Sequence, residues 1–232
     1  MPTALVIGAS SGIGEALARR LVGAGWTVAG FARRASPFDG SMTRGRYHHI
    51  VADVRSPDYR GALTAALDRF EVVDACIYVA GIGYELELPA FDREADVFTT
   101  NLVGAVITAE IVLPRMIAKR AGHFIGLSSQ ADGLISPRTP SYSASKAGMS
   151  AYLEGVALAC RPHGVAVTNV RFGFVDTAMS RGTRPFLISA DRAAALVERC
   201  MVRRPIRYTF PWRMVPLVWL FGLGARLRVW LS

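Results

Sequence analysis

The sequence predicts a single-domain α/β fold, in which a doubly wound parallel sheet is followed by a helical C-terminal extension. The first observation is that short apolar runs alternate with longer segments of helical periodicity along most of the chain. The second is size: 232 residues, 51% of them hydrophobic, suffice for one well-buried domain. Alternating strands and helices build a parallel sheet with helices on both faces. We expect this domain over residues 1–210 and an apolar, arginine-rich extension over residues 211–232.

Each strand is predicted from a short apolar run, often β-branched and bounded by turn residues. These runs cover residues 3–7, 27–32, 49–52, 74–80, 123–128 and 165–172. Helices are predicted where apolar residues recur at helical spacing, as Ile13, Leu17 and Leu21 do ahead of Gly25. They cover residues 12–24, 57–70, 101–120, 141–161 and 191–202, the last capped by Ser189 or Asp191. A final edge strand is expected within residues 203–211.

Positive charge is concentrated near the C-terminus. The formal net charge is +9, and from Arg181 onward ten arginines stand against two acidic residues. Such a patch can meet a nucleic acid, an anionic membrane or an acidic partner, or it can be a solvated surface. No nucleic-acid-binding signature accompanies it, so we expect no nucleic-acid partner.

The three cysteines, Cys76, Cys160 and Cys200, are far apart and lie among apolar residues. We expect three buried thiols, with neither a disulfide framework nor a metal site.

The first residues, MPTALVIG, lack the charged-then-apolar pattern of a signal peptide. This start predicts a cytoplasmic protein.

A glycine-rich turn follows the first predicted strand. In LVIGASSGIGEALARRL, Gly8, Gly12 and Gly14 lead from the strand into a helix. Glycines let the backbone approach a pyrophosphate held at the positive end of that helix. Arg33 and Arg34 end the second strand, where an acid would bind a ribose 2′-hydroxyl and an arginine accommodates a 2′-phosphate. Two guanidinium groups and no carboxylate favour NADP over NAD.

One of the two lysines of the chain lies four residues after a tyrosine, in SYSASKAGM. On a helix, Tyr142 and Lys146 share a face and can address one ligand. A tyrosine hydroxyl titrates near ~10 in water, and a nearby ammonium is expected to lower that pKa. Tyr142 would then serve as a proton donor to a carbonyl oxygen or as an acceptor from an alcohol.

These motifs are accompanied by a serine at the end of a predicted strand and an asparagine at the start of the helix before it. Ser129 follows the apolar run HFIGLS, and Asn101, in TTNLVGAV, opens the helix before it. With the glycine turn, Asp53 in ADV and the segment FGFVDT at 172–177, the chain closely resembles the short-chain dehydrogenase/reductase family from Thr3 to about Thr177.

The resemblance implies a Rossmann-like fold and a role for each matching residue. Tyr142 would be the general acid or base, Ser129 would orient the substrate carbonyl, and Lys146 would lower the pKa of Tyr142 and bond the nicotinamide ribose. Asn101 would hold a water in a proton relay. The NADP(H) site would comprise Gly8, Ser10, Ser11, Gly12, Ile13, Gly14, Arg33, Arg34, Asp53, Val54, Ala80, Gly81, Tyr142, Lys146, Gly173, Val175 and Thr177.

Two positions depart from the family pattern. Val79 stands where the family has the asparagine of Asn-Ala-Gly, and Phe172-Gly173 replaces Pro-Gly. The four catalytic positions are unaffected. Residues 178–190 fall where the family places its substrate loop, and Tyr84, Met179 and Phe186 are candidate substrate contacts.

The predicted function is an NADP(H)-dependent oxidoreductase that interconverts a carbonyl and an alcohol on a small-molecule, lipophilic substrate. The alternative is a catalytically silent NADP-binding sensor or scaffold, with the membrane as a further partner. The resemblance also implies a homodimer or homotetramer formed through helices 101–120 and 141–161.

The tail WRMVPLVWLFGLGARLRVWLS leaves three interpretations open. It is an apolar lid, a subunit contact or a membrane-surface segment. Its uncharged stretch between Arg213 and Arg226 spans twelve residues, which we expect to be too short to cross a bilayer.

Overall fold

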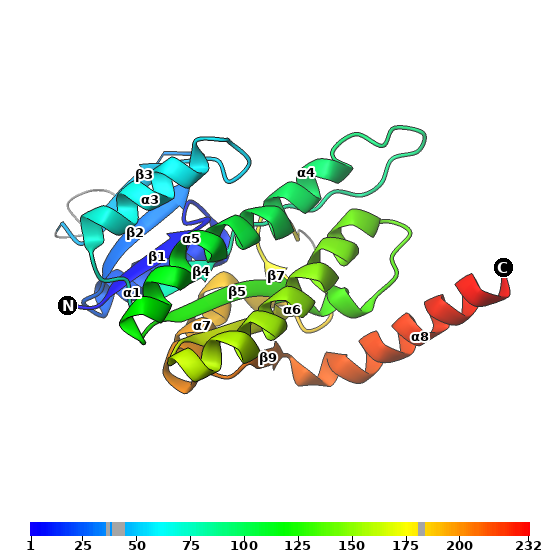
Figure 1. Ribbon diagram of the computed structural model, residues 1–232. Helices are drawn as coiled ribbons and strands as arrows, with labels where there is room; N and C mark the ends of the chain where they lie inside the picture. Colours follow the sequence, from blue (N-terminus) through cyan, green and yellow to red (C-terminus); the bar gives the residue numbers. More distant parts are fainter. Residues whose placement is uncertain (36–37, 39–44, 181–183) are drawn as a thin grey trace.

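A parallel sheet forms the centre of the computed structural model, which describes residues 1–35, 38, 45–180 and 184–232 (Figure 1). Its seven strands lie in the order β3-β2-β1-β4-β5-β6-β9, and every neighbouring pair is parallel. They are β1 (Thr3–Ile7), β2 (Thr27–Ala32), β3 (Tyr47–Val51), β4 (Ala75–Tyr78), β5 (His123–Ser129), β6 (Ala166–Phe172) and β9 (Arg207–Phe210). The strand order reverses between β1 and β4, and ligands of such sheets bind beyond the carboxyl ends at that reversal.

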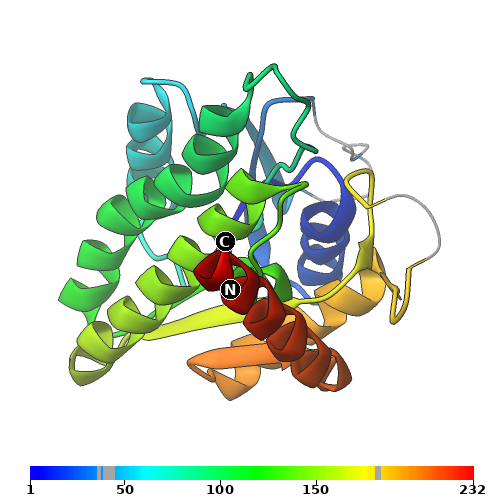
Figure 2. The same cartoon turned by 90° about the vertical axis from the view of Figure 1, so that its right-hand side faces the viewer.

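Helices cover both faces of the sheet (Figure 2). Helices α1 and α7 pack together on one face, and α3, α5 and α6 lie on the other. Their bounds are α1 (Gly12–Gly23), α3 (Tyr59–Phe70), α4 (Glu94–Phe98), α5 (Gly104–Lys119), α6 (Pro140–Cys160), α7 (Ala190–Arg203) and α8 (Val215–Leu231). Short helical turns are η1 (Thr99–Val103), η2 (Gln130–Gly133), η3 (Arg161–His163) and η4 (Trp212–Met214). Outside the main sheet, β7 (Val175–Asp176) pairs with β8 (Ile188–Ser189).

The central strands β1 and β4 are largely apolar because both of their faces are buried, whereas the edge strands β3 and β9 are partly exposed and carry polar residues. In β1, Leu5 and Ile7 pack into the core beneath α3, α5 and α6, whereas Ala4 and Val6 pack into the core beneath α1 and α7. This alternation follows from the period of two along a strand. The doubly wound fold predicted from the sequence is confirmed.

The helix predicted over residues 101–120 begins earlier than expected. Helix α4 starts at Glu94, continues through the π-helical turn η1 and runs on into α5. Asn101 therefore lies inside a long helix and does not open it. The residue before α4, Arg93, has a positive φ of 75° and no capping hydrogen bond, so the usual sequence signal for a helix start is missing. π-helical turns occur frequently at functional sites.

The other predicted helices and strands begin and end within a few residues of the expected positions. Ser189 caps α7 by accepting a hydrogen bond from the Arg192 amide, as one of the two expected residues. The expected edge strand forms as β9, beside β6. Cys76, Cys160 and Cys200 are free and buried, as predicted.

The C-terminal extension forms a helix that projects from the body of the protein (Figure 1). The helix includes Arg226 and Arg228, so it is longer than the uncharged stretch counted in the sequence. By length and composition alone, residues Trp212–Leu231 suffice to cross a membrane, which corrects the expectation that they are too short. The helix Glu94–Lys119 is also long and apolar enough to cross a membrane, but half of its apolar stretch is buried in the core.

Candidate active site

The four predicted catalytic residues lie beyond or beside the carboxyl end of β5. Ser129 is the last residue of β5, and Tyr142 and Lys146 lie in the first two turns of α6. Asn101 reaches the same region from η1. The fold thus gathers residues that are up to 45 positions apart in the sequence.

The Ser129 hydroxyl lies within a polar turn. Its Oγ accepts a hydrogen bond from the Ala131 amide at 3.1 Å and donates a long one to the Phe172 carbonyl at 3.4 Å. The Tyr142 side chain lies near this hydroxyl, and the interaction of the two groups acts to lower the pKa of Tyr142. A carbonyl oxygen placed between them can accept from both.

The pKa of Tyr142 is raised, which contradicts the expected lowering by Lys146. Burial of the phenol raises this pKa most, and the negative charge of Asp132 adds to the increase. The nearby Ser129 hydroxyl acts in the opposite direction on the pKa of Tyr142. Because the charged phenolate is disfavoured, Tyr142 holds its proton at neutral pH in this state.

Lys146 is buried, with 5% of its surface exposed, and its Nζ donates to the Leu127 carbonyl oxygen at 2.8 Å. Burial lowers the pKa of this ammonium to about 8. The Nζ atom lies 5.9 Å from the centroid of the Tyr142 ring. The lysine is therefore beside the tyrosine, as the spacing predicts, but its hydrogen bond is directed to the sheet.

Asn101 is fully buried, and its amide is bound by protein groups. The side-chain oxygen accepts from the Ile82 amide at 2.8 Å, while the nitrogen donates to the Ile82 carbonyl and to the Ser145 hydroxyl. A Cβ added to Gly81 would lie 3.3 Å from this oxygen and 3.5 Å from the Lys146 nitrogen. Gly81 thus lies between Asn101 and Lys146, while the water relay stays a prediction.

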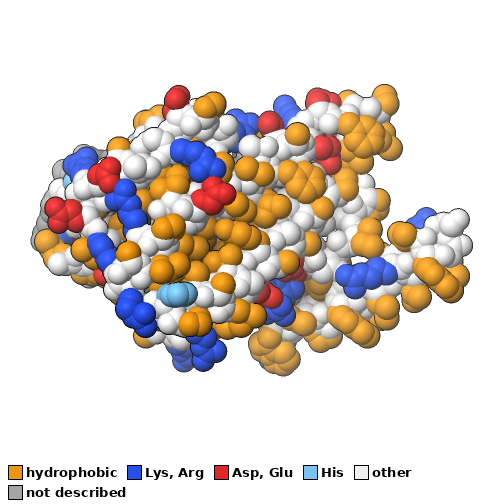
Figure 3. Space-filling view, viewed as in Figure 1, with side chains coloured by type: hydrophobic (Ala, Val, Ile, Leu, Met, Phe, Trp, Pro, Cys, Tyr) orange, Lys and Arg blue, Asp and Glu red, His pale blue; other side chains and the backbone are white. Residues whose placement is uncertain are grey.

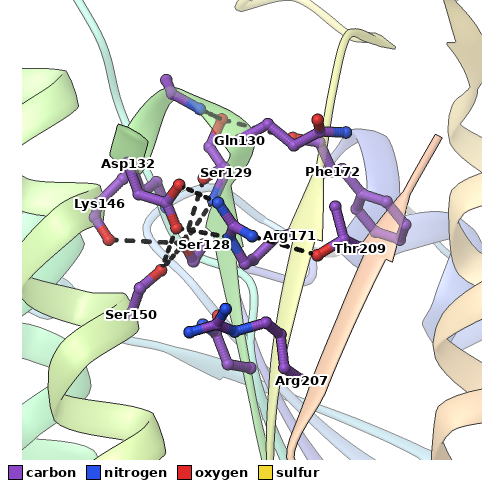
Figure 4. A network of polar contacts seen from close by, with 12 residues as sticks. Ser128, Ser129, Gln130, Asp132, Lys146, Ser150, Arg171, Phe172, Arg207 and Thr209 are labelled. Atoms are coloured by element: carbon purple, nitrogen blue, oxygen red, sulfur yellow. Dashed lines mark hydrogen bonds and ion pairs between the residues drawn. The ribbon is translucent and has the colours of Figure 1, made fainter. Parts of the chain in front are cut away.

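A buried ion pair that the sequence did not indicate lies behind Ser129 (Figure 4). The guanidinium of Arg171 donates to both carboxylate oxygens of Asp132, at 2.6 and 2.5 Å. The same carboxylate accepts from Ser150, whose hydroxyl also contacts that of Ser128 at 2.5 Å. The network joins η2, α6 and β6, and so fixes the turn that carries Ser129.

The glycine turn fits a dinucleotide, because backbone occupies the space that side chains would need. A Cβ on Gly14 would lie 2.1 Å from the Gly8 carbonyl oxygen, and one on Gly8 would lie 2.7 Å from the Ala80 nitrogen. Gly12 has a positive φ of 57°, which favours glycine. Ile13, in the first turn of α1, is half-buried and packs against the core. Ser11 precedes α1 without a capping side-chain bond, so the first amides of the helix can receive a phosphate.

The two predicted phosphate-binding arginines lie beside this turn. Arg33 and Arg34 are both exposed, and Arg34 donates to the Ser11 hydroxyl at 2.8 Å and more weakly to Ser10 at 3.4 Å. Asp53 is held by Arg55, whose hydrogen bonds are the largest cause of the lowered pKa of Asp53.

The remaining predicted cofactor residues divide into two groups. Ala80 and Gly81 are half-buried after β4, and the Thr177 methyl would lie 3.1 Å from a Cβ on Gly12, so these line the turn. Val54 and Val175 are buried. A Cβ on Gly173 would lie 2.6 Å from the sulfur of Met214, so Gly173 makes room for the segment leading to α8.

The three candidate substrate contacts are exposed at this edge of the sheet. The Tyr84 ring lies under the Arg93 guanidinium, 4.9 Å from its centroid. Met179 and Phe186 flank residues 181–183, which lie outside the described residues. Among the described residues, no group of three or more His, Cys, Asp or Glu side chains is arranged to hold a metal ion.

Comparison with known proteins agrees with this geometry. The family model described as short chain dehydrogenase matches residues 2–187. An uncharacterized oxidoreductase of Myxococcus xanthus is 32% identical over 225 residues, covering 91% of this chain and 88% of the relative. A 3-oxoacyl-acyl-carrier-protein reductase of Vibrio cholerae is 31% identical over 204 residues, covering 84% and 80%. The solved structure of a Sphingobium yanoikuyae short-chain dehydrogenase in complex with NADPH superposes with a TM-score of 0.82 at 22% identity, covering 100% and 96%.

The chain belongs to the short-chain dehydrogenase family. It is thus an oxidoreductase of the kind that acts on an alcohol or a carbonyl group with a nicotinamide cofactor.

Proposed function

We propose that the protein is an NADP(H)-dependent reductase that converts a carbonyl group to an alcohol, with Tyr142 as the proton donor. The observation that carries this proposal is that Ser129, at the carboxyl end of β5, and Tyr142 lie close enough to interact, with the Lys146 Nζ atom 5.9 Å from the centroid of the tyrosine ring. Asn101 joins the same group of side chains through Ser145.

The chain's own residues orient the substrate and supply the proton. The bound nicotinamide would supply the hydride. Ser129 and Tyr142 would donate hydrogen bonds to the carbonyl oxygen and stabilise the negative charge that develops on it. Tyr142 would then transfer its hydroxyl proton to that oxygen. The phenol is protonated at neutral pH, as a proton donor to the carbonyl oxygen has to be.

NADP(H) is proposed over NAD(H) because two arginines follow β2. Arg34 is already held against the glycine turn by Ser11, and Arg33 is exposed next to it. A guanidinium can bind a 2′-phosphate through two parallel hydrogen bonds. The NADPH in the Sphingobium yanoikuyae structure agrees with this choice.

The proposed substrate is a lipophilic ketone, with 3-oxoacyl thioesters as its first candidate class. Met179 and Phe186 expose apolar surface on the segment after β6. The relative from Vibrio cholerae is named a 3-oxoacyl-acyl-carrier-protein reductase.

We further propose a cytoplasmic homo-oligomer that assembles through α5 and α6. Hydrophobic side chains gather over the face that these helices present (Figure 3). Leu158 in α6 is 65% exposed, and Val103 directly before α5 is exposed as well. A second copy would cover this surface.

The test is the rate of NADPH oxidation with 3-oxoacyl thioesters and simple ketones of increasing chain length. We expect turnover that increases with chain length and that is slower with NADH. Tight NADPH binding without turnover of any carbonyl would instead favour a catalytically silent sensor.

A further inference from the structure

Helix α8 with its preceding turn, residues Trp212–Leu231, is the most exposed apolar segment of the described chain. Only 6% of its most apolar stretch is buried, against 50% for the comparably apolar core helix Glu94–Lys119. An apolar helix that is not covered by its own domain needs another apolar environment.

One narrow stripe of α8 touches the body of the protein. Met214, Val218, Gly222 and Ala225 recur at intervals of three or four residues and are the less exposed positions. A Cβ on Gly222 would lie 2.4 Å from the Gly133 carbonyl oxygen, so the helix backbone lies directly on η2. This contact holds the part of α8 up to Ala225 against the body, while the C-terminal residues 226–232 are all exposed and project beyond it (Figure 1).

The sides of α8 that face away from this stripe carry large apolar side chains and no acidic residue. With Trp212 just before the helix, the exposed apolar residues are Val215, Leu217, Trp219, Leu220, Phe221, Leu223, Leu227, Val229, Trp230 and Leu231. They surround most of the helix, whereas a helix that docks on one protein partner needs an apolar face on one side only. Lipid covers all of these sides at once.

The charges of the segment match an anionic surface. Arg213, Arg226 and Arg228 lie within it, and no acidic residue follows Glu198 in the sequence. Figure 3 shows Lys or Arg side chains beside the hydrophobic ones on the projecting segment. Arginines reach phosphate groups while their stems lie along apolar surface, and tryptophans at both ends of a helix suit the headgroup region.

We propose that α8 docks the protein onto an anionic lipid bilayer, lying in the plane of the interface with its apolar sides in the outer acyl region and its arginines at the lipid phosphates. The contact stripe on η2 argues for this orientation over a spanning one, because a spanning helix would have to leave the body. Since η2 follows Ser129 directly, docking places the carboxyl edge of the sheet beside the membrane.

Vesicle binding by the full-length protein tests the proposal. Phosphatidylcholine vesicles with and without phosphatidylglycerol are compared by co-sedimentation. We expect binding to the anionic vesicles, a blue shift of tryptophan fluorescence, and quenching by lipids brominated near the headgroup more than by lipids brominated near the chain end. Stronger quenching from the chain end would contradict the interfacial orientation.

Two glutamate variants distinguish binding through the apolar sides of α8 from a general effect of added negative charge. Leu220→Glu in α8 and Val202→Glu in α7 make the same charge change at exposed positions, 60% and 84% exposed. We expect Leu220→Glu to weaken vesicle binding at least tenfold and Val202→Glu to leave it within about twofold. NADPH binding and circular dichroism establish that both variants are folded. Equal losses in the two variants would overturn the proposal.

Two arginine variants test the charge contribution. Arg226→Gln and Arg228→Gln are each expected to weaken binding to anionic vesicles about fivefold. If the wild-type protein binds neither kind of vesicle, and Leu220→Glu instead dissociates an oligomer in solution, α8 is a contact between copies of this chain and the membrane proposal is wrong.

Discussion

The ammonium group of Lys146 lies beside the Tyr142 ring but donates its hydrogen bond to the carbonyl oxygen of Leu127. The two side chains share a helix face at the end of β5, where Lys146 is buried and Tyr142 is half-buried. Burial therefore dominates both groups: it raises the pKa of the phenol and lowers the pKa of the ammonium. At neutral pH the phenol is protonated, while the ammonium, with a pKa of about 8, still carries its charge in most molecules.

The buried ammonium predicts a pH-dependent difference in stability between the wild type and Lys146→Met. The pKa of Lys146 is about 8 in the folded protein and 10.5 as its ordinary value. Between these values the unfolded chain binds more protons, so the free energy of unfolding rises with pH. Relative to Lys146→Met, the wild type should lose up to about 3 kcal/mol below pH 8 and regain it toward pH 10.5. Urea unfolding of both proteins from pH 7 to 10.5 measures this, and parallel curves would refute it.

A single methyl group in the glycine turn should weaken cofactor binding. In Gly14→Ala the new Cβ would meet the Gly8 carbonyl oxygen at 2.1 Å, and backbone cannot yield as a flexible side chain does. We expect NADPH affinity to fall at least tenfold, together with a loss of stability of about 1–3 kcal/mol.

Gly23→Ala is the matched control in the same helix, because nothing lies within 4 Å of its Cβ position. It should keep NADPH affinity and gain about 0.5–1 kcal/mol of stability. Isothermal titration and thermal unfolding report both quantities. Comparable NADPH affinity in the two alanine variants would show that the turn does not hold the cofactor closely.

The choice between the two nicotinamide cofactors should depend on Arg33 and Arg34. Replacing both by alanine removes the charged groups proposed to bind the 2′-phosphate. We expect kcat/KM for NADPH to fall about 10- to 100-fold, since hydrogen bonds to charged groups contribute about 1.5–3 kcal/mol. The value for NADH, which lacks this phosphate, serves as the internal control and should change little. An equal decrease for both cofactors would mean that the arginines support the turn and do not select the phosphate.

The ion pair behind Ser129 should matter for stability because its carboxylate is almost fully enclosed. The side chains of Arg171 and Asp132 are 16% and 6% exposed. Arg171→Met leaves an unpaired buried carboxylate and should cost about 3–5 kcal/mol. Arg138→Met, which breaks a solvent-exposed pair with Glu85, should cost far less, because water screens that pair. Denaturant unfolding compares the two, and similar costs would count against a structural role for the Asp132 network.

Much of the fold could be predicted from local patterns. Strands β1 and β2 form at the residues expected, because a fully buried strand is a continuous apolar run bounded by turns. The start of α4 could not be found, since Arg93 precedes it in a left-handed conformation and provides no cap signal. The boundary depends on packing that a local pattern does not record.

The candidate site, too, could be predicted from the sequence only in part. The spacing of Tyr142 and Lys146 correctly placed both residues on one helix face. The direction of the tyrosine pKa was wrong, because burial depends on residues from several elements. Asp132 and Arg171 are 39 positions apart and gave no sequence signal, and only the folded chain brings them together.

The most direct test of the account is the turnover of Tyr142→Phe with NADPH and a ketone substrate of the wild type. The variant keeps the ring that packs against Gly83 and removes only the hydroxyl. We predict a fall in kcat of about 100- to 10,000-fold, the range of general acid catalysis, with NADPH affinity unchanged within about twofold. A variant that binds NADPH normally and retains most of its turnover would contradict Tyr142 as the proton donor.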